Sequence, residues 1–363
     1  MPLGISKIER LEVYCNQEKV GVLALTHENL CAFQYDAAFL QNGFSISPFH
    51  LPLERKVFVA KPNPFSGNFG VFNDSLPDGW GSLLLDRYLK KNGIEVDKLN
   101  QLQRLAIIGS SGRGALEYVP DWSITEKATT HDLNILAKDA EKILLTKYHG
   151  NGLDILFKNG ASSGGARPKV FLKIKNEEWL IKFKSSADPP NIGKTEYDYS
   201  ILAQQCGIKM PLTCLFEKRY FGVQRFDRNA TKRIHTISAA GLLNADYRIP
   251  SLDYEMLLRA CFLLTKNMEE VLQLYRIMVF NVAIGNKDDH AKNFSFQFEN
   301  GQWKLSPAYD LLPSSGFNGN HTTTINGKGT PDEEDLLIVA KKIGIAERTA
   351  CSIKKEIYAL CRK

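Results

Sequence analysis

The segment 286–310 constrains this chain more than any other part of its sequence. Asp288 and Asn293 stand five residues apart, and Asp310 follows 17 residues after Asn293. The residues between them alternate between aromatic and polar side chains and include an Asn300-Gly301 pair, which favours the tight turn of a β-hairpin. Because a hairpin brings its two ends together, we expect Asn293 and Asp310 to be neighbours.

This arrangement suits phosphoryl transfer from a nucleotide. That reaction uses one carboxylate to accept the proton of a substrate hydroxyl, and an asparagine and a second carboxylate to hold Mg²⁺ on the phosphates. The spacing predicts Asp288 rather than Asp289 as the catalytic base, because only Asp288 has the five-residue step to Asn293. Asn293 and Asp310 are then the predicted metal ligands. A solvated loop before an ordinary hairpin is the alternative.

A glycine-bearing loop and the strand after it are candidates for holding the nucleotide. Gly164 and Gly165 can offer backbone N–H groups to phosphate oxygens, although the loop lacks the Walker pattern and a flexible turn is the alternative. Lys182 on the following strand can meet the phosphates, with Glu196 of the next helix as its ion-pair partner. Lys184 lies on the same face, so an ordinary surface lysine is the competing interpretation.

The order of the expected elements indicates an α+β protein with the two-lobed plan of kinases. Three regions are separated by pattern, at residues 1–120, 121–226 and 227–363, and the first two are rich in strands while the third is mainly helical. We expect a helix from Asn267 to Gly285, and two further helices in the last 30 residues. Thr195 is expected to cap a helix that runs to Cys206, with Gly207 as its stop.

Composition limits the class of protein further. The formal charge of +6 is mild, so it permits an acidic or nucleic-acid partner without requiring one. The seven cysteines include no C-x-x-C pair, and we expect reduced, mostly buried thiols. The N-terminus has no apolar core of a secretory signal, and no apolar stretch approaches the ~20 residues of a membrane span. We therefore expect a cytoplasmic protein without a membrane partner.

Several ordered motifs resemble the HipA-like serine/threonine kinases, which are the toxins of bacterial type II toxin–antitoxin pairs. The resemblance covers nearly the whole chain, and residues 1–120 are similar to the N-terminal subdomain of that family. The motifs that carry it are Asn286-Lys-Asp-Asp-His-Ala-Lys-Asn-Phe-Ser, Ala308-Tyr-Asp-Leu-Leu, Ser162-Ser-Gly-Gly-Ala-Arg-Pro-Lys, Leu180-Ile-Lys182, Val223-Gln-Arg-Phe-Asp-Arg, Leu76-Pro-Asp-Gly and Leu105-Ala-Ile-Ile-Gly.

The resemblance implies an ATP- and Mg²⁺-dependent protein kinase that phosphorylates a translation component, for which an aminoacyl-tRNA synthetase is the family's precedent. It implies Asp288 as catalytic base, with Asn293 and Asp310 as Mg²⁺ ligands. Autophosphorylation is implied at Ser162, with the adjacent Ser163 as the alternative, and it would inhibit by adding negative charge beside the nucleotide. The implied nucleotide contacts are Gly164, Gly165, Ala166, Lys182, His290 and the backbones of Gln224 and Phe226.

The resemblance also implies a helix-turn-helix antitoxin as partner, through which the pair binds operator DNA. One departure from the family is Arg167-Pro168 in place of Gln-Glu, where the proline removes a backbone N–H from the loop. Two other functions stay open. Small-molecule phosphotransferases share the spacing of Asp288, His290 and Asn293, in which His290 is a ligand or base, or a structural histidine that braces the loop. A non-catalytic co-repressor bound to DNA with an antitoxin is the second.

Overall fold

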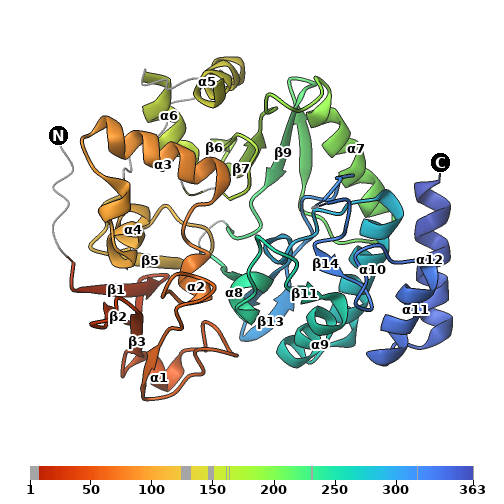
Figure 1. The fold of residues 1–363 in the computed structure, drawn as a ribbon, viewed down its shortest axis with the longest axis horizontal. Helices are drawn as coiled ribbons and strands as arrows, with labels where there is room; N and C mark the ends of the chain where they lie inside the picture. Colours follow the sequence, from red (N-terminus) through yellow and green to blue (C-terminus); the bar gives the residue numbers. More distant parts are fainter. Residues whose placement is uncertain are drawn as a thin grey trace. The chain divides into compact units, whose positions relative to one another are not determined.

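The structure is a computed structural model that describes residues 8–123, 132–145, 151–160, 162, 164–229, 232–316 and 318–362. The chain divides into two compact units. The first unit comprises Met1–Lys194 and Cys214–His235, and the second comprises Thr195–Thr213 and Thr236–Lys363. Figure 1 shows the elements of both along the chain. The strands gather mainly in the first unit and the longest helix lies in the second.

The first unit begins with an antiparallel sheet of strand order β4-β3-β2-β1-β5. Side chains of β1 alternate across the sheet, so that Leu11 and Val13 are fully buried between more exposed neighbours. Asn16 and Gln17 both adopt positive φ, the geometry of a tight hairpin turn. The strands are β1 (Arg10–Cys15), β2 (Glu18–Leu25), β3 (Cys31–Tyr35), β4 (Val57–Val59) and β5 (Leu116–Val119).

A second sheet of the first unit has the order β6-β7-β9-β8 and carries the candidate nucleotide residues. Its strands β6 (Lys169–Ile174) and β7 (Glu177–Lys182) form a hairpin around Lys175 and Asn176, which have positive φ. Strands β8 (Thr213–Phe216) and β9 (Tyr220–Gln224) complete it, with β9 antiparallel to β7.

Helices of the first unit pack with this second sheet around one hydrophobic core. The core includes Trp80, Leu84, Leu156 and Ile181, all nearly or fully buried. The helices of the unit are α1 (Phe39–Asn42), α2 (Gly70–Asn73), α3 (Gly79–Lys91), η1 (Val96–Lys98), α4 (Gln101–Ile108), α5 (Leu133–Leu145) and α6 (Asn151–Gly160).

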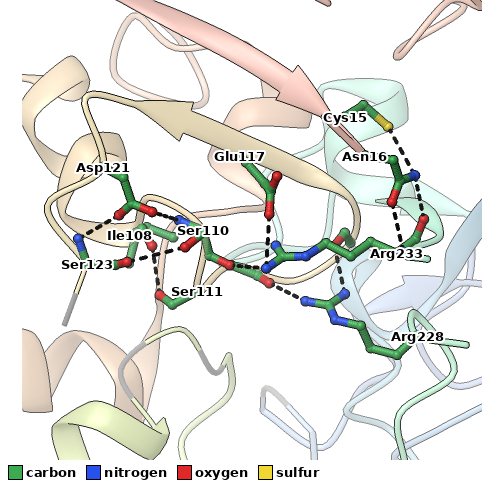
Figure 2. A network of polar contacts seen from close by, with 12 residues as sticks. Cys15, Asn16, Ile108, Ser110, Ser111, Glu117, Asp121, Ser123, Arg228 and Arg233 are labelled. Carbon is green, nitrogen blue, oxygen red and sulfur yellow. Dashed lines mark hydrogen bonds and ion pairs between the residues drawn. The ribbon is translucent and has the colours of Figure 1, made fainter. Parts of the chain in front are cut away.

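The segment after β9 is bonded to the loop that precedes β5, also within the first unit (Figure 2). The buried carboxylate of Asp227 accepts the Gly114 N–H at 2.8 Å, and Arg228 donates to the carbonyls of Gly112 at 2.9 Å and Gly114 at 2.7 Å. Burial acts to raise the pKa of Asp227, but the guanidinium groups of Arg225 and Arg228 hold that pKa far below its usual range. The last part of the 223–228 motif is therefore an ionic clamp.

Arg233 extends the same contact, as Figure 2 also shows. It donates to the Ser110 carbonyl at 2.5 Å and forms an ion pair with Glu117 at 3.0 Å. The side chain of Asn16 bonds both the N–H and the carbonyl of Arg233, each at 2.9 Å. Asp227, Arg228 and Arg233 thus bond the segment after the second sheet to the N-terminal sheet and the loop before β5, within one unit.

The second unit contains most of the long helices and the predicted hairpin. That hairpin is confirmed: β12 and β13 pair antiparallel around Asn300 and Gly301, which have positive φ. In the part of this unit that the structure describes, β10-β12-β13 form one sheet, and β11 pairs with β14 in parallel. The strands are β10 (His235–Ser238), β11 (Leu252–Asp253), β12 (Ser295–Glu299), β13 (Gln302–Leu305) and β14 (Thr323–Thr324).

The expected helices of this unit are present, with one wrong boundary. Gly207, which has positive φ, follows the end of α7 as predicted. The prediction of Thr195 as its cap is wrong, because α7 starts three residues earlier, directly after Pro189-Pro190 and Asn191, where prolines favour a helix start. The helices are α7 (Ile192–Gln205), α8 (Ala239–Leu243), α9 (Tyr254–Thr265), α10 (Met268–Ile284), η2 (Ala291–Asn293), α11 (Glu333–Lys342) and α12 (Glu347–Cys361).

None of the helices in the described ranges is long and apolar enough to cross a membrane.

A buried histidine of the first unit makes its stability depend on pH. His235 is buried, its Nε2 lies 2.8 Å from the Ile46 carbonyl, and burial lowers the pKa of His235 to about 4. An unfolded histidine has a pKa of about 6.5, so between these values the unfolded state binds more protons. The contribution of His235 to the free energy of unfolding is therefore complete above pH 6.5, and it decreases as the pH falls toward 4.

We predict that the free energy of unfolding falls by about 2 kcal/mol from pH 7.5 to pH 5.0 through this histidine. Urea unfolding at both pH values measures it. His235→Gln keeps a side-chain N–H but does not titrate, so it should lose this part of the pH dependence. The exposed His27 supplies the control variant, His27→Gln, which should behave as the wild type. Equal pH dependence in His235→Gln would refute the assignment.

Candidate active site

The candidate catalytic loop follows helix α10 in the second unit. Gly285 ends the helix in the left-handed conformation, with φ of 70°. Asn286 then turns back, and its N–H donates to the Asn281 carbonyl at 2.8 Å. Of the two aspartates that follow, Asp288 is exposed and Asp289 has no exposed surface. The two aspartates therefore differ in solvent exposure as well as in their spacing from Asn293.

Asn293 ends the short helix η2 and is fixed by the loop itself. Its side-chain Nδ2 donates to the Asp288 carbonyl at 2.6 Å, and its backbone N–H donates to the His290 carbonyl at 2.8 Å. With Nδ2 committed to a carbonyl, Oδ1 is the atom of this amide that can meet a cation. An amide oxygen and a carboxylate are the hard oxygen ligands that Mg²⁺ prefers, so Asn293 and Asp310 fit that ion.

The two ends of the hairpin meet through Tyr309, the residue before Asp310. Its hydroxyl lies 2.6 Å from the Ser295 hydroxyl and donates to the Lys292 carbonyl at 2.8 Å. Asp310 has a φ of 55°, an uncommon conformation for aspartate, and Asn286 Nδ2 bonds its carbonyl at 3.3 Å. The expected proximity of the hairpin ends is therefore observed.

Two other residues of the loop have roles that the structure specifies. His290 caps η2, because its Nδ1 accepts the Lys292 N–H at 3.2 Å. Lys292 is buried, and its Nζ lies 4.1 Å from the centroid of the Tyr247 ring. Lys292 had no role predicted from the sequence, although a lysine directly before the predicted metal ligand Asn293 was a readable signal.

The glycine loop is bonded to the start of helix α3 within the first unit. Gly165 donates its N–H to the Asp78 carboxylate, and the Gly165 carbonyl accepts the Trp80 N–H at 2.9 Å. Lys169 Nζ donates to the Gly164 carbonyl, and the Trp80 indole donates to the Lys169 carbonyl at 3.1 Å. The Asp78 carboxylate therefore accepts the hydrogen bond from the Gly165 N–H, which was predicted to contact phosphate.

The departure at Arg167 also has a structural explanation. Its guanidinium Nε lies 3.1 and 3.0 Å from the two carboxylate oxygens of Asp188. Asp188 in turn accepts the N–H of Ser185 at 2.8 Å. Burial acts to raise the pKa of Asp188, but these hydrogen bonds keep it below its usual value. Arg167 thus anchors the end of the loop to the segment after β7.

Lys182 and Lys184 differ strongly in burial, and the expected shared strand face is not present, because β7 ends at Lys182 and Lys184 lies beyond it. Lys182 is 7 % exposed and its Nζ lies 5.6 Å from the Phe221 ring centroid. The Lys184 side chain is 45 % exposed and pairs with Glu141 at 3.9 Å. Only Lys182 has the sheltered position that a nucleotide contact needs. Glu196 is buried in α7, which belongs mostly to the second unit.

The remaining predicted residues belong to the segment before β6 and to the end of the inner strand β9. Gln224 ends β9 opposite Trp179, and Phe226 is half-buried beyond it. Ser162 is buried at 6 % exposure, and Ala166 is exposed. Ser163 lies outside the described residues. No cluster of three His, Cys, Asp or Glu side chains suited to a metal occurs in the described parts of the chain, so a site there needs the Asn293 amide, phosphate oxygens or water.

Comparison with solved structures gives the class of the fold. The HipA chain from the Shewanella oneidensis MR-1 complex of HipA, HipB and operator DNA matches with a TM-score of 0.71 and 18 % identity. The match covers 96 % of this chain and 88 % of that one. The protein is thus an α+β protein with the fold of that HipA chain, and it has a strand-rich first unit and a more helical second unit.

Sequence profiles then identify the family. Residues 11–119 match the HipA N-terminal domain, and residues 161–363 match the HipA-like C-terminal domain. The chain belongs to the HipA-like family. Two relatives from Sinorhizobium fredii have the word kinase in their names. Y4dM is 22 % identical over 383 residues, covering 96 % of this chain and 90 % of its own, and Y4mE is 30 % identical over 180 residues, covering 43 % of each.

We predict that Gly79→Ala displaces the glycine loop. Gly79 has a φ of 45°, and a Cβ there would overlap the Gly165 carbonyl. Gly93 has a φ of 74° with open space around it, so Gly93→Ala is the matched control for backbone strain alone. The control should cost about 1 kcal/mol, and Gly79→Ala about 1–3 kcal/mol more. Urea unfolding and hydrogen exchange of peptide 164–169 measure this, and equal effects of the two variants would contradict the contact.

Proposed function

We propose that the protein is an ATP- and Mg²⁺-dependent serine/threonine protein kinase that acts as the toxin of a toxin–antitoxin pair and phosphorylates a translation component. The observation that carries this proposal is the loop itself, in which an exposed Asp288 precedes Asn293 and the Tyr309-Asp310 turn is bonded back to it. This loop lies within the HipA-like C-terminal domain.

Asp288 accepts the proton of the substrate hydroxyl as that oxygen attacks the γ-phosphorus and ADP departs. The neighbouring Asp289 is unsuited to this task, because it has no exposed surface and its carboxylate accepts four hydrogen bonds. Asn293 and Asp310 would hold Mg²⁺, which would supply positive charge to the phosphates. Lys292, buried beside Asn293, adds a further cation to the same loop.

On the nucleotide side, Lys182 contacts the phosphates and the backbones of Gln224 and Phe226 face adenine. Residues 164–166 cover the phosphates. A phosphate oxygen that takes the Gly165 N–H replaces the Asp78 carboxylate bonded to it in this structure. In this proposal residues 1–120 form the N-terminal subdomain, 121–226 the N-terminal lobe and 227–363 the C-terminal lobe.

A helix-turn-helix antitoxin is the proposed partner, through which the protein reaches operator DNA in the cytoplasm. The structural neighbour supports this, because it is a HipA chain in a complex with HipB and operator DNA. The formal charge of +6 is compatible with such a complex.

We predict that Asp288→Asn lowers phosphoryl transfer by about 10³-fold, because a general base contributes rate enhancements of this order. Labelled ATP with Mg²⁺ and the purified full chain provide the assay, with ATP affinity measured in parallel and expected to stay within about threefold. Asp310→Asn should lose phosphoryl transfer, and added Mg²⁺ should not restore it. Glu347→Gln, at an exposed site on α12, is the control with wild-type rate. Full activity in Asp288→Asn would reject the proposed base.

Loop phosphorylation gives an independent prediction. Phosphate on Ser162 would add about two negative charges at a side chain that is 6 % exposed here, so the loop must move to be modified and stay displaced afterwards. Ser162→Ala should therefore remove the label from the loop peptide on mass-spectrometric mapping. Ser163→Ala should retain it, and the opposite pattern would transfer the assignment to Ser163.

A further inference from the structure

Asp289, the aspartate that the spacing excluded as a base, lies at the centre of a buried polar cage in the second unit. Its Oδ2 accepts the Tyr254 hydroxyl at 3.0 Å and lies 2.8 Å from His321 Nδ1. Its Oδ1 accepts the N–H groups of Thr322 at 2.9 Å and Thr323 at 3.2 Å. Burial and the nearby carboxylate raise the pKa of Tyr254 well above its usual value, so its hydroxyl remains a donor.

The cage continues from Tyr254 to the turn that contains Asp310. The Tyr254 hydroxyl accepts the Asn281 amide at 3.0 Å, and Asn281 Oδ1 accepts the Asn286 amide at 2.9 Å. Asn286 Nδ2 also reaches the Asp310 carbonyl at 3.3 Å. A single chain of hydrogen bonds, buried as far as Asn286, thus connects the residue next to Asp288 with the backbone of Asp310.

The segment that follows Asp310 returns to the same loop. Lys287 donates its N–H to the Ser314 carbonyl at 3.2 Å and its Nζ to the Gly319 carbonyl at 2.7 Å. The Lys287 carbonyl accepts the Thr322 N–H at 3.1 Å. Beyond this point Thr323 and Thr324 pair with β11. The segment is therefore held at both ends by residues 286–289.

The chemistry of this cage is unusual for a purely structural core. A buried carboxylate must be desolvated, and apolar side chains of similar volume often stabilise a core as well or better. What an apolar core cannot provide is direction, because hydrogen bonds fix the angles of the groups that they join. Since Asp288 and Asp289 share a peptide bond, the cage that fixes Asp289 also fixes the backbone from which the Asp288 side chain projects.

We propose that Asp289, Tyr254 and His321 are positioning residues that hold Asp288 and Asp310 at fixed positions relative to each other for phosphoryl transfer. The inference rests on the proposed function. It implies that hydrogen bonds to residues 286–289 order the described residues that follow Asp310, at 311–316 and 318–324.

Tyr254→Phe tests the proposal, because it removes one hydroxyl from the middle of the cage and leaves the ring in place. Tyr275→Phe is the matched control. Tyr275 is equally buried in the same unit, but its hydroxyl bonds the Leu336 carbonyl at 3.2 Å, outside the cage. Hydrogen exchange of the full chain is followed in peptides 285–294 and 307–312. We expect about tenfold faster exchange in both peptides for Tyr254→Phe and wild-type exchange for Tyr275→Phe.

Exchange in Tyr254→Phe that matches the wild type, or equal changes in the two variants, would overturn the proposal. This readout does not need catalysis. If the wild type transfers no phosphate, the proposed function fails, while the exchange result still decides whether the cage fixes both loops.

If the wild type is active, kinetics separate positioning from folding. Tyr254→Phe should lower kcat about tenfold with the KM for ATP within about twofold, and Tyr275→Phe should change neither. His321→Asn keeps an N–H near the position of Nδ1 and should retain at least about half of kcat, whereas His321→Leu should not. Equal losses in the two His321 variants would show that the N–H is not what matters.

Discussion

A carboxylate without exposed surface determines how the second unit is built. Taking the charge of Asp289 out of water is costly unless every lone pair finds a donor. Its donors come from α9, from the segment before β14 and from Thr323 of β14, so these distant parts of the chain must close together around the candidate catalytic loop. The cost of an incomplete cage makes this closure cooperative. We therefore expect the loop to be held firmly, although it carries an exposed aspartate.

The first unit uses a buried carboxylate in a different way. Asp227 is compensated by two guanidinium groups, which hold its pKa far below the usual range, whereas the donors to Asp289 include neutral hydroxyl and backbone groups. An ion pair with arginine is strong and tolerant of small displacements, which suits a contact between two sheets. Directional neutral donors suit a loop whose backbone angles matter. The charged partners of Asp227 thus suit a contact between sheets, and the neutral donors to Asp289 suit a loop of fixed backbone geometry.

The sequence predicted those parts of the fold that depend on neighbouring residues. The hairpin around Asn300 and Gly301 and the helix that ends at Gly285 follow from turn and cap chemistry, and both are present. The cap at Thr195 was wrong because the proline pair upstream starts the helix earlier. The contacts of Asp289 with His321 and of Asp78 with Gly165 span 32 and 87 residues. No local periodicity encodes such pairs, and so the burial of Asp289 and the occupied glycine loop could not be predicted.

The chain leaves the first unit after Lys194 and returns to it at Cys214. Strand β9 lies between β7 and β8, and the ionic clamp of Asp227 and Arg228 follows β9 in the sequence. The first unit is therefore incomplete while only its first 194 residues have left the ribosome. Until then β7 has an unpaired edge, a template for unwanted pairing. The start of the second unit is made before the end of the first. We therefore expect the first unit to complete its second sheet only after the start of the second unit has been made.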